Sequence, residues 1–525
     1  MYAQSHISLP IFYHLRVAYS TPFNARLSSL CLPPFPPWFA VRPSQPSAVP
    51  RRNPRPFPPR GGATAGDAPN SAWQDPGKLG PEWDYPAPDH DGRPDRRSVL
   101  LGEWGGRQLS VADDRHMVTI AGSRAGKSQT VLIPNLRAYP GPAVVIDPKG
   151  ELFAATRAER SRLGEVIWLD PFNVTGQGSH AYNPLAELAL TSPDLLGAES
   201  AQIADALIIP PERGDSHWTD AAKNLITGII LHLVTTDPAT ATIPLLRTHL
   251  TKEAELPYLL DAMASNDQLD GMVSNVGRSM MGKFTREAGR ETSMTQEMRS
   301  IVSTASEQTR PLDDVHRALA RSDFQLSWLS DPSRRPMTVY LIIPATRIAT
   351  HHRWLRLFIY QVLAALERQS IPRERLPLWL VLEEFAALGP MRNIEAAAGY
   401  MAGFGIKLWA ILQDLTQLKR HYPDSWETFL GNAGVIQAFA NVDVTTTRYL
   451  SSLLGDATVI ERQQNFTDHN QFSKGDDGTR EQRRSVPLLA PAEITFHFAR
   501  KTNRQLVLVP GESPVYMMRL PLPSD

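Results

Sequence analysis

A short loop near residue 122 carries the residue types that bind phosphate. The run Gly122-Ser-Arg-Ala-Gly-Lys-Ser128 follows an apolar segment, 117–120, that predicts a buried strand, and residues 129–136 can begin a helix. A strand, a glycine loop and a helix N-terminus together form an anion site, because backbone N–H groups and the helix dipole face the bound charge. Lys127 would then reach the β- and γ-phosphates of a nucleotide, and the Ser128 hydroxyl would ligate Mg²⁺. The residues predicted to bind the nucleotide are Gly122, Ser123, Arg124, Ala125, Gly126, Lys127, Ser128 and Gln129.

The loop departs from the usual pattern at one position. Ala121 stands where the motif G-x-x-x-x-G-K-[ST] has its first glycine, and Gly122 follows it. The alternative interpretation is a glycine-containing turn that binds nothing. Because Gly-Lys-Ser lies here between a predicted strand and a predicted helix, the sequence favours nucleotide binding.

Two adjacent carboxylates provide the second half of an ATPase site. Glu383 and Glu384 follow the apolar run 378–382, which is typical of a Walker B strand. The first carboxylate of such a pair holds the Mg²⁺ shell, and the second orients or deprotonates the water that attacks the γ-phosphate. Glu383 occupies the position usually held by aspartate, and it could serve through a bridging water. A charged turn after a buried strand is the alternative.

A carboxamide follows another predicted strand. Gln413 comes directly after the apolar run 406–412, where it could contact the γ-phosphate and report its presence. Taken alone, the same residue could equally be a hydrogen bonder at the end of a strand. The predicted catalytic residues are therefore Lys127, Glu383, Glu384 and Gln413, and the predicted metal ligands are Ser128 and Glu383.

The elements that position these residues read as alternating strands and helices. Further apolar runs at 143–146, 166–169 and 337–343 predict more buried strands, and an amphipathic helix is expected over 354–366. Strands with polar groups at their carboxyl ends, separated by helices, predict a parallel sheet of the RecA type. Asp147 and Asp170 each end one of these strands. We expect Asp147 near the site, because its strand should neighbour the P-loop strand, whereas Asp170 reads better as a turn former.

The remaining regions differ from the motor pattern. Residues 185–336 show helical periodicity with almost no β-runs, which predicts an inserted all-α domain. Its middle is basic, but glutamates are interleaved with the basic residues, so a solvated face is favoured over the alternative of a DNA-contacting patch; the residues are Arg278, Lys283, Arg286, Arg290 and Arg299, with Glu287, Glu291 and Glu297. A capping box at 293–296 would open one of its helices. Residues 461–485 are polar, with isolated Phe466 and Phe472 and an expected turn at 474–478, and they read as a flexible loop. Residues 505–520 predict a terminal hairpin that closes the sheet. The predicted order is a tail (1–98), the first motor part (99–184), the insert (185–336) and the second motor part (337–525).

Composition limits the functional classes. Lys+Arg and Asp+Glu both number 54, so any nucleic-acid contact must come from local groups rather than bulk charge. A single cysteine excludes a disulfide framework, and no apolar run approaches the ~18 residues needed to span a bilayer. The tail holds 19 of the 45 prolines, a density that predicts disorder. A basic arm for an anionic partner, a targeting peptide and an upstream extension are the alternatives for the tail.

Six short motifs occur in an order that resembles one protein family. They are Gly122–Ser128, Asp147–Glu151, Asn183-Pro184, Glu384–Gly389, Gln413–Leu418 and Phe429–Gly434. Over residues 99–521 this order resembles the type IV secretion coupling proteins, the TraG/TraD-like conjugative DNA-transfer ATPases.

The resemblance implies a RecA-like P-loop NTPase motor domain (an α/β fold) with an inserted all-α domain, assembled as a homo-hexamer. ATP and Mg²⁺ would be its cofactors, with Lys127, Ser128, Glu383, Glu384 and Gln413 carrying the chemistry. Its partners would be relaxase-bound single-stranded DNA, or protein substrates, and the components of a type IV secretion channel. Family members usually carry N-terminal transmembrane helices, and here the proline-rich tail occupies that region. We therefore expect a cytoplasmic protein at the cytoplasmic face of the bacterial inner membrane, held there through partners.

Two other functions fit the same sequence features. One is a DNA pump for chromosome or plasmid handling, which would share the motor. The other is a nucleotide-gated docking protein that recruits secreted effectors and hydrolyses ATP slowly.

Overall fold

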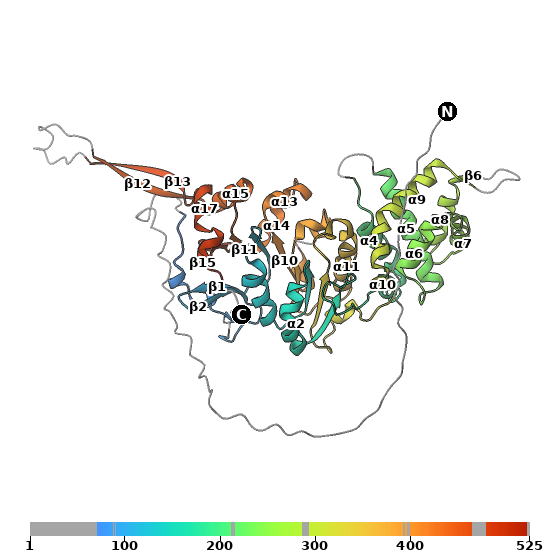
Figure 1. The fold of residues 1–525 in the computed structure, drawn as a ribbon, viewed down its shortest axis with the longest axis horizontal. Helices are drawn as coiled ribbons and strands as arrows, with labels where there is room; N and C mark the ends of the chain where they lie inside the picture. Colours follow the sequence, from blue (N-terminus) through green and yellow to red (C-terminus); the bar gives the residue numbers. More distant parts are fainter. Residues whose placement is uncertain are drawn as a thin grey trace, which may run out of the picture. The chain divides into compact units, whose positions relative to one another are not determined.

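One mixed sheet of eleven strands organises the described part of the protein (Figure 1). The computed structural model describes residues 71–521, with gaps at 88, 90, 212–215, 286–292, 392–393, 396–399 and 465–478. The order across the sheet is β2-β1-β15-β14-β11-β3-β10-β9-β4-β8-β5. The strands are β1 (Val99–Trp104), β2 (Arg107–Val111), β3 (His116–Ala121), β4 (Ala143–Asp147), β5 (Glu165–Leu169), β8 (Met337–Ile342), β9 (Leu378–Leu382), β10 (Ile406–Leu412), β11 (Ala433–Phe439), β14 (Arg504–Leu508) and β15 (Val515–Met518).

The half of the sheet from β11 to β5 is entirely parallel, as the sequence predicts. Its strands are continuous apolar runs because both faces are covered. Val118 and Ile120 of β3 enter one hydrophobic core, while Met117 and Ala121 of the same strand enter a second core on the opposite face. The predicted RecA-type motor therefore rests on strands that are buried on both faces.

Helices of the motor cover these two faces. They are α1 (Ile133–Ala138), α2 (Glu151–Leu163), α11 (Ile348–Arg368), α13 (Leu415–His421), α14 (Trp426–Gly431), α15 (Val444–Leu454) and α17 (Pro491–His497). A π-helical turn, η3 (Ser128–Leu132), precedes α1 directly after the phosphate loop.

The strand order corrects one prediction from the sequence. We expected the strand of Asp147 to neighbour the P-loop strand, but β10 and β9 lie between β3 and β4. Sequential strands are adjacent only about two-thirds of the time. Here the strands that intervene come from more than 230 residues further along the chain, so no local pattern indicates them.

Residues 185–336 are almost wholly helical. They contain most of α3 (Pro184–Leu188), followed by α4 (Pro193–Leu207), α5 (His217–Thr236), α6 (Ile243–Thr251), α7 (Leu256–Ala264), α8 (Met272–Met281), α9 (Gln296–Thr309) and α10 (His316–Leu319). The two strands between them, β6 (Phe284–Thr285) and β7 (Ser293–Met294), are two residues each. The cap of α9 is Thr295, whose hydroxyl accepts from the Met298 N–H, rather than the predicted Ser293.

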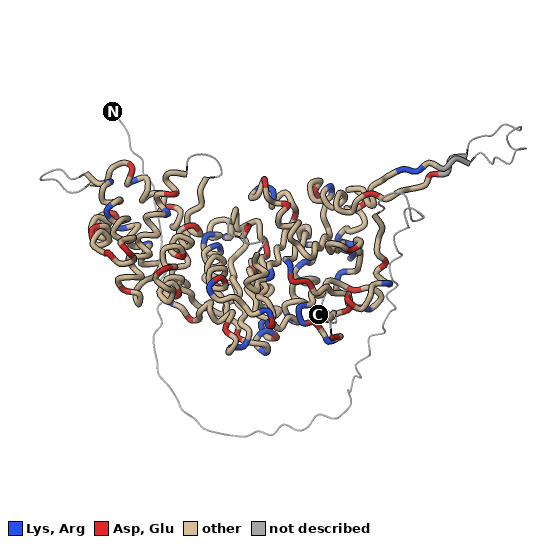
Figure 2. The backbone as a smooth tube through the Cα atoms, turned by 180° about the vertical axis from the view of Figure 1, so that it is seen from behind, with Lys and Arg blue, Asp and Glu red and all other residues tan. Residues whose placement is uncertain are grey.

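Charged residues of both signs are interspersed through this helical region (Figure 2), and several of them lie in ion pairs. Lys283 forms an ion pair with Glu297, and Arg278 forms one with Asp267, with 3.4 Å between Arg278 Nη2 and Asp267 Oδ1. This is consistent with the predicted solvated face. Arg286, Glu287, Arg290 and Glu291 lie outside the described residues.

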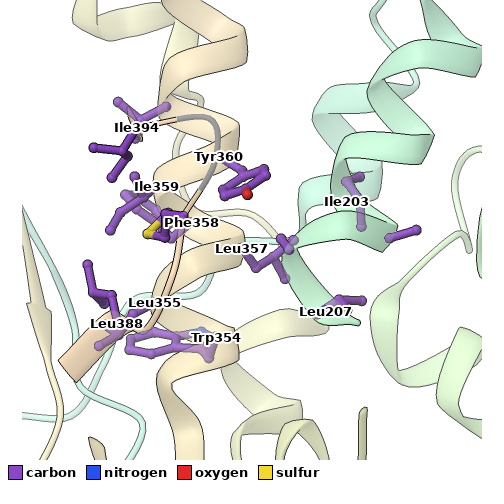
Figure 3. Packing of buried hydrophobic residues seen from close by; sticks show 14 of the residues in the cluster. Ile203, Leu207, Trp354, Leu355, Leu357, Phe358, Ile359, Tyr360, Leu388 and Ile394 are labelled. Atoms are coloured by element: carbon purple, nitrogen blue, oxygen red, sulfur yellow. The ribbon is translucent and has the colours of Figure 1, made fainter. Parts of the chain in front are cut away.

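Helix α11 joins the motor to the helical region. Leu357 and Tyr360 of α11 lie towards Ile203 and Leu207 of α4, whereas Leu355 and Ile359 lie towards Leu388 and Ile394, in the segment that follows β9 (Figure 3). On the same helix, the Arg353 and Arg356 guanidinium groups donate to the carbonyls of Leu207 and Ala206 at 3.0 and 3.2 Å. Cations at the C-terminus of α4 satisfy carbonyls that the helix leaves unpaired.

Residues 71–98 correct the predicted extent of the tail. Within this stretch Leu79 and Trp83 are buried, and the Arg107 guanidinium donates to the carbonyls of Leu79 and Gly80 at 2.8 and 2.7 Å. The prediction of disorder is therefore wrong for these residues. Prolines here begin two short 3₁₀ turns, η1 (Pro76–Lys78) and η2 (Pro81–Trp83), a position that proline tolerates. Residues 1–70 lie outside the described part of the chain.

A two-stranded antiparallel ribbon replaces much of the predicted loop at 461–485. Strands β12 (Asp456–Gln464) and β13 (Thr479–Pro487) pair only with each other and extend away from α15 and α17 (Figure 1). Among the described side chains of this ribbon, Ala457 alone belongs to a hydrophobic core, so the ribbon needs no apolar period and its sequence reads as a loop. Phe466, Phe472 and the expected turn at 474–478 lie outside the described residues.

The C-terminal hairpin forms as predicted but does not close the sheet. Strands β14 and β15 pair antiparallel, and β1 and β2 continue the sheet beyond them. Within the described ranges, no helix has both the length and the apolar character that a membrane crossing requires.

Candidate nucleotide site

The phosphate loop connects β3 to η3 with a strained backbone. Arg124 and Gly126 both have left-handed φ angles, 54° and 86°, a conformation that is natural for glycine and rare for other residues. Gly122 is needed for a different reason: a Cβ atom there would lie 2.1 Å from the Ala440 carbonyl oxygen. The first-glycine position of the motif, Ala121, is the last residue of the buried strand β3, where alanine fits. The loop therefore tolerates its imperfect motif.

Lys127 is the centre of the ionic contacts in the site. Its Nζ lies 2.9 Å from Glu384 Oε1 and 3.7 Å from Glu383 Oε1. The Ser128 hydroxyl donates to Glu383 Oε1 at 3.3 Å. Glu384 is held in a left-handed conformation, φ 59°, at the end of β9, as is common for strained functional turns.

Gln413 contacts the same carboxylate. Its Nε2 donates to both Glu384 oxygens, at 2.9 and 3.0 Å. Strand β10 lies between β3 and β9, so its carboxyl end necessarily lies between the phosphate loop and the two glutamates. In this structure Gln413 therefore orients Glu384, a contact that its position in the sequence does not reveal.

These side chains surround one cavity of about 640 Å³, within the size range of small-molecule sites. Every residue predicted to bind nucleotide or to act in catalysis lines it except Gly122, which packs against Ala440. The lining also includes Lys149 and Glu151, which lie in the predicted motif Asp147–Glu151 but had no assigned role, and Ile348, which the sequence did not single out. Lys149 and Glu151 belong to the stretch that follows β4, so the motif beginning at Asp147 does reach the cavity.

Burial sets the electrostatics of the carboxylates. It raises the pKa of Glu383 to about 7, with Lys127 lowering it and the neighbouring Asp147 and Glu384 raising it further. Burial likewise raises the pKa of Asp147 to about 6, against backbone hydrogen bonds that lower it. Lys127 thus faces an excess of acidic groups, and the Ser128 hydroxyl lies beside a carboxylate oxygen of Glu383. These hard oxygen donors suit Mg²⁺.

The two strand-end aspartates act as caps. Asp147 is buried and accepts hydrogen bonds from the Phe153 and Lys149 N–H groups, at 2.8 and 3.4 Å. Asp170 accepts from the Val174 and Thr175 N–H groups, both at 2.8 Å. The turn-former interpretation describes both residues, although the charge of Asp147 still acts on Glu383.

One side chain that contacts the phosphate loop escaped the sequence analysis. Arg519, directly after β15, donates through its guanidinium to the Ala125 carbonyl. The two residues are 394 positions apart and Arg519 belongs to no recognisable motif, so only the three-dimensional fold shows the contact.

The whole chain was compared with known families and structures. A sequence model described as "Type IV secretory system Conjugative DNA transfer" matches residues 85–521. The chain belongs to this family. It is 28% identical over 429 residues to the protein VirD4 of Agrobacterium fabrum, covering 80% of this chain and 61% of that protein. It is 27% identical over 440 residues to a conjugal transfer protein TraG of Escherichia coli, with 78% and 67% covered. The chain thus spans about three fifths of the VirD4 relative.

Solved structures agree with the fold of this family member. The plasmid coupling protein TrwB in complex with the ATP analogue ADPNP superposes with a TM-score of 0.62 at 16% identity, covering 89% of this chain and 97% of that one. TrwB in complex with ADP and Mg²⁺ gives 0.62 at 15% identity, covering 90% and 96%. These likenesses and the parallel sheet confirm the predicted RecA-like α/β fold with a helical insertion.

Proposed function

We propose that the protein is the ATP-driven coupling protein of a type IV secretion or conjugation system, which recruits DNA or protein substrates and translocates them to the secretion channel. The observation that carries this proposal is the meeting of Lys127, Ser128, Glu383, Glu384 and Gln413 around one cavity, in a chain of the conjugative DNA-transfer family. The match to VirD4 and TraG proteins supports the secretion context.

The contacts around Lys127 suggest how the site works. Lys127 is paired with Glu384 at 2.9 Å, and the phosphates of ATP would replace Glu384 as the partner of the Lys127 ammonium group. Glu384, released from Lys127 but still held by Gln413, would then orient or deprotonate the attacking water. Ser128 and Glu383 would hold Mg²⁺, which when bound offsets the negative charge of the phosphates. Gln413 would report the γ-phosphate through its contact with Glu384.

The quaternary and cellular parts of the proposal rest on the family. The protein would assemble as a homo-hexamer, with an arginine of a neighbouring subunit completing each site, at the cytoplasmic face of the bacterial inner membrane through partners. Its domains would be a motor formed by residues 71–184 and 337–521 and a helical insert over 185–336. Because the net charge is zero, contacts to single-stranded, relaxase-bound DNA would come from local groups.

ATPase activity with and without DNA tests the proposal. Single-stranded DNA should strongly stimulate ATP hydrolysis by the purified protein, and Lys127→Ala should abolish that activity. Lys78→Ala is a matched control, since it removes an exposed ammonium group that lies outside the cavity. Slow hydrolysis that DNA does not change would instead favour the effector-docking function. Stimulation without association with channel components would favour a DNA pump for chromosome or plasmid handling.

A further inference from the structure

Arg519 is a buried cation on the outer side of the phosphate loop. Its exposure is only 3%, and its guanidinium stacks over the Phe439 ring with 4.8 Å between the charge centre and the ring centroid. One terminal nitrogen donates to the Ala125 carbonyl and the other donates to the Arg500 carbonyl at 2.8 Å. The backbone N–H of Arg519 donates to the Asn503 carbonyl at 2.8 Å. The guanidinium is therefore fixed by the C-terminal part of the chain and reaches into the loop.

The carbonyl that Arg519 holds belongs to the critical peptide of the loop. The peptide joining Ala125 to Gly126 lies between two left-handed residues, Arg124 and Gly126. In a trans peptide the C=O and N–H groups point in opposite directions. A carbonyl turned towards Arg519 therefore turns the Gly126 N–H to the opposite side, and both residues of this peptide line the cavity.

The guanidinium also changes the chemistry of that peptide. A charged donor on the carbonyl polarises the peptide and makes its N–H a stronger hydrogen-bond donor. A loop with left-handed residues on both sides of Ala125 has an unfavourable backbone that surrounding contacts must hold in place. Arg519 supplies such a contact from outside, where it does not compete with a ligand inside the cavity.

We propose that Arg519 is a positioning residue for nucleotide binding: it fixes the Ala125–Gly126 peptide so that the Gly126 N–H donates to a phosphate of the nucleotide. The proposal rests on the function proposed above. It adds to it a residue that touches no substrate atom and acts through the loop backbone.

Nucleotide affinity and steady-state kinetics of full-length variants test this role. In Arg519→Met, the Kd for a non-hydrolysable ATP analogue with Mg²⁺ and the KM for ATP should both rise about ten- to hundredfold, the range for a hydrogen bond to a charged group. The kcat at saturating ATP should stay near that of the wild type. Arg519→Lys should give a smaller rise of about three- to tenfold, because an ammonium group keeps the charge but cannot hold both carbonyls in one fork. Arg500→Met is the matched control, since it removes an exposed side chain and leaves the carbonyl that Arg519 binds.

Several outcomes would overturn the proposal. A merely structural role would lower the melting temperature of nucleotide-free Arg519→Met without changing its Kd or the KM. If Arg519→Met does not fold, Arg519→Lys decides, and unchanged affinity and KM in that variant refute the role. If the wild type binds the analogue, Lys127→Ala abolishes that binding and Arg519→Met binds as well as the wild type, only the role of Arg519 is refuted. Wild-type protein that binds no nucleotide removes the proposed function as well.

Discussion

Replacing Glu384 with glutamine should separate nucleotide binding from hydrolysis. Glu384 Oε1 lies 2.9 Å from Lys127 Nζ, and their side chains are 27% and 15% exposed. The direct attraction is about 6 kcal/mol at an effective dielectric constant of ~20, but desolvation leaves about 1 kcal/mol net for a partly exposed pair. ATP must displace this interaction to reach the ammonium group. Glu384→Gln removes it, so the affinity for ATP should rise about fivefold.

Hydrolysis should move in the opposite direction. A carboxamide can still accept a hydrogen bond from Gln413, so the local geometry at the end of β9 is retained. It cannot take a proton from water. Loss of a general base should lower kcat by about two to four orders of magnitude. The variant should therefore bind ATP tightly and turn it over very slowly.

Equilibrium titration with a fluorescent nucleotide and a phosphate-release assay measure the two effects. Glu367→Gln makes the same chemical change at an exposed carboxylate outside the cavity, near the C-terminus of α11. That control should behave like the wild type in both assays. Normal hydrolysis by Glu384→Gln would show that the general base is another residue. Weaker ATP binding by this variant would refute the idea that ATP phosphates displace Glu384 from Lys127.

Two further predictions concern stability. Trp83→Ala should lower the free energy of unfolding, measured by chemical denaturation, by about 3–5 kcal/mol, because the Trp83 side chain is only 4% exposed. Trp218→Ala, at a side chain 39% exposed, should lower it far less. Equal losses in the two variants would contradict the packing of residues 71–98. Burial lowers the pKa of Lys407 from 10.5 to about 8, partly opposed by Asp113. Between these values the unfolded chain binds a proton that the folded chain has released, so wild-type stability relative to Lys407→Met should rise with pH by up to about 3 kcal/mol. A difference between the two denaturation curves that does not change from pH 8 to 10.5 would exclude that shift.

The buried strands could be predicted from the sequence because both faces of the parallel sheet are covered. The runs at 117–120, 143–146, 166–169, 337–343, 378–382 and 406–412 all became strands. Strands that lie elsewhere were harder to recognise. β1 and β2 belong to the antiparallel part of the sheet, and among the described side chains of β12 and β13 only Ala457 enters a hydrophobic core, so neither pair shows the continuous apolar run on which the predictions depended.

Convergence of the site residues could be predicted only in outline. The phosphate loop and the paired glutamates each had a motif, and both line the cavity. The partners of individual side chains depend on strand order, which the sequence left open. The hydrogen bond from Gln413 to Glu384 joins the ends of the neighbouring strands β10 and β9, and the one from Arg519 to Ala125 joins residues 394 positions apart.

Strand register explains why the core pattern also sets the chemistry. Leu412 of β10 pairs with Ile120 of β3, and Ala410 of β10 pairs with Leu382 of β9. All four side chains enter the same hydrophobic core. A slip of β10 by one residue would exchange its two faces, moving Trp409 and Ile411 out of the opposite core. The apolar alternation thus excludes a one-residue slip of β10, and the register that pairs Leu412 with Ile120 brings the next residue, Gln413, beside Glu384.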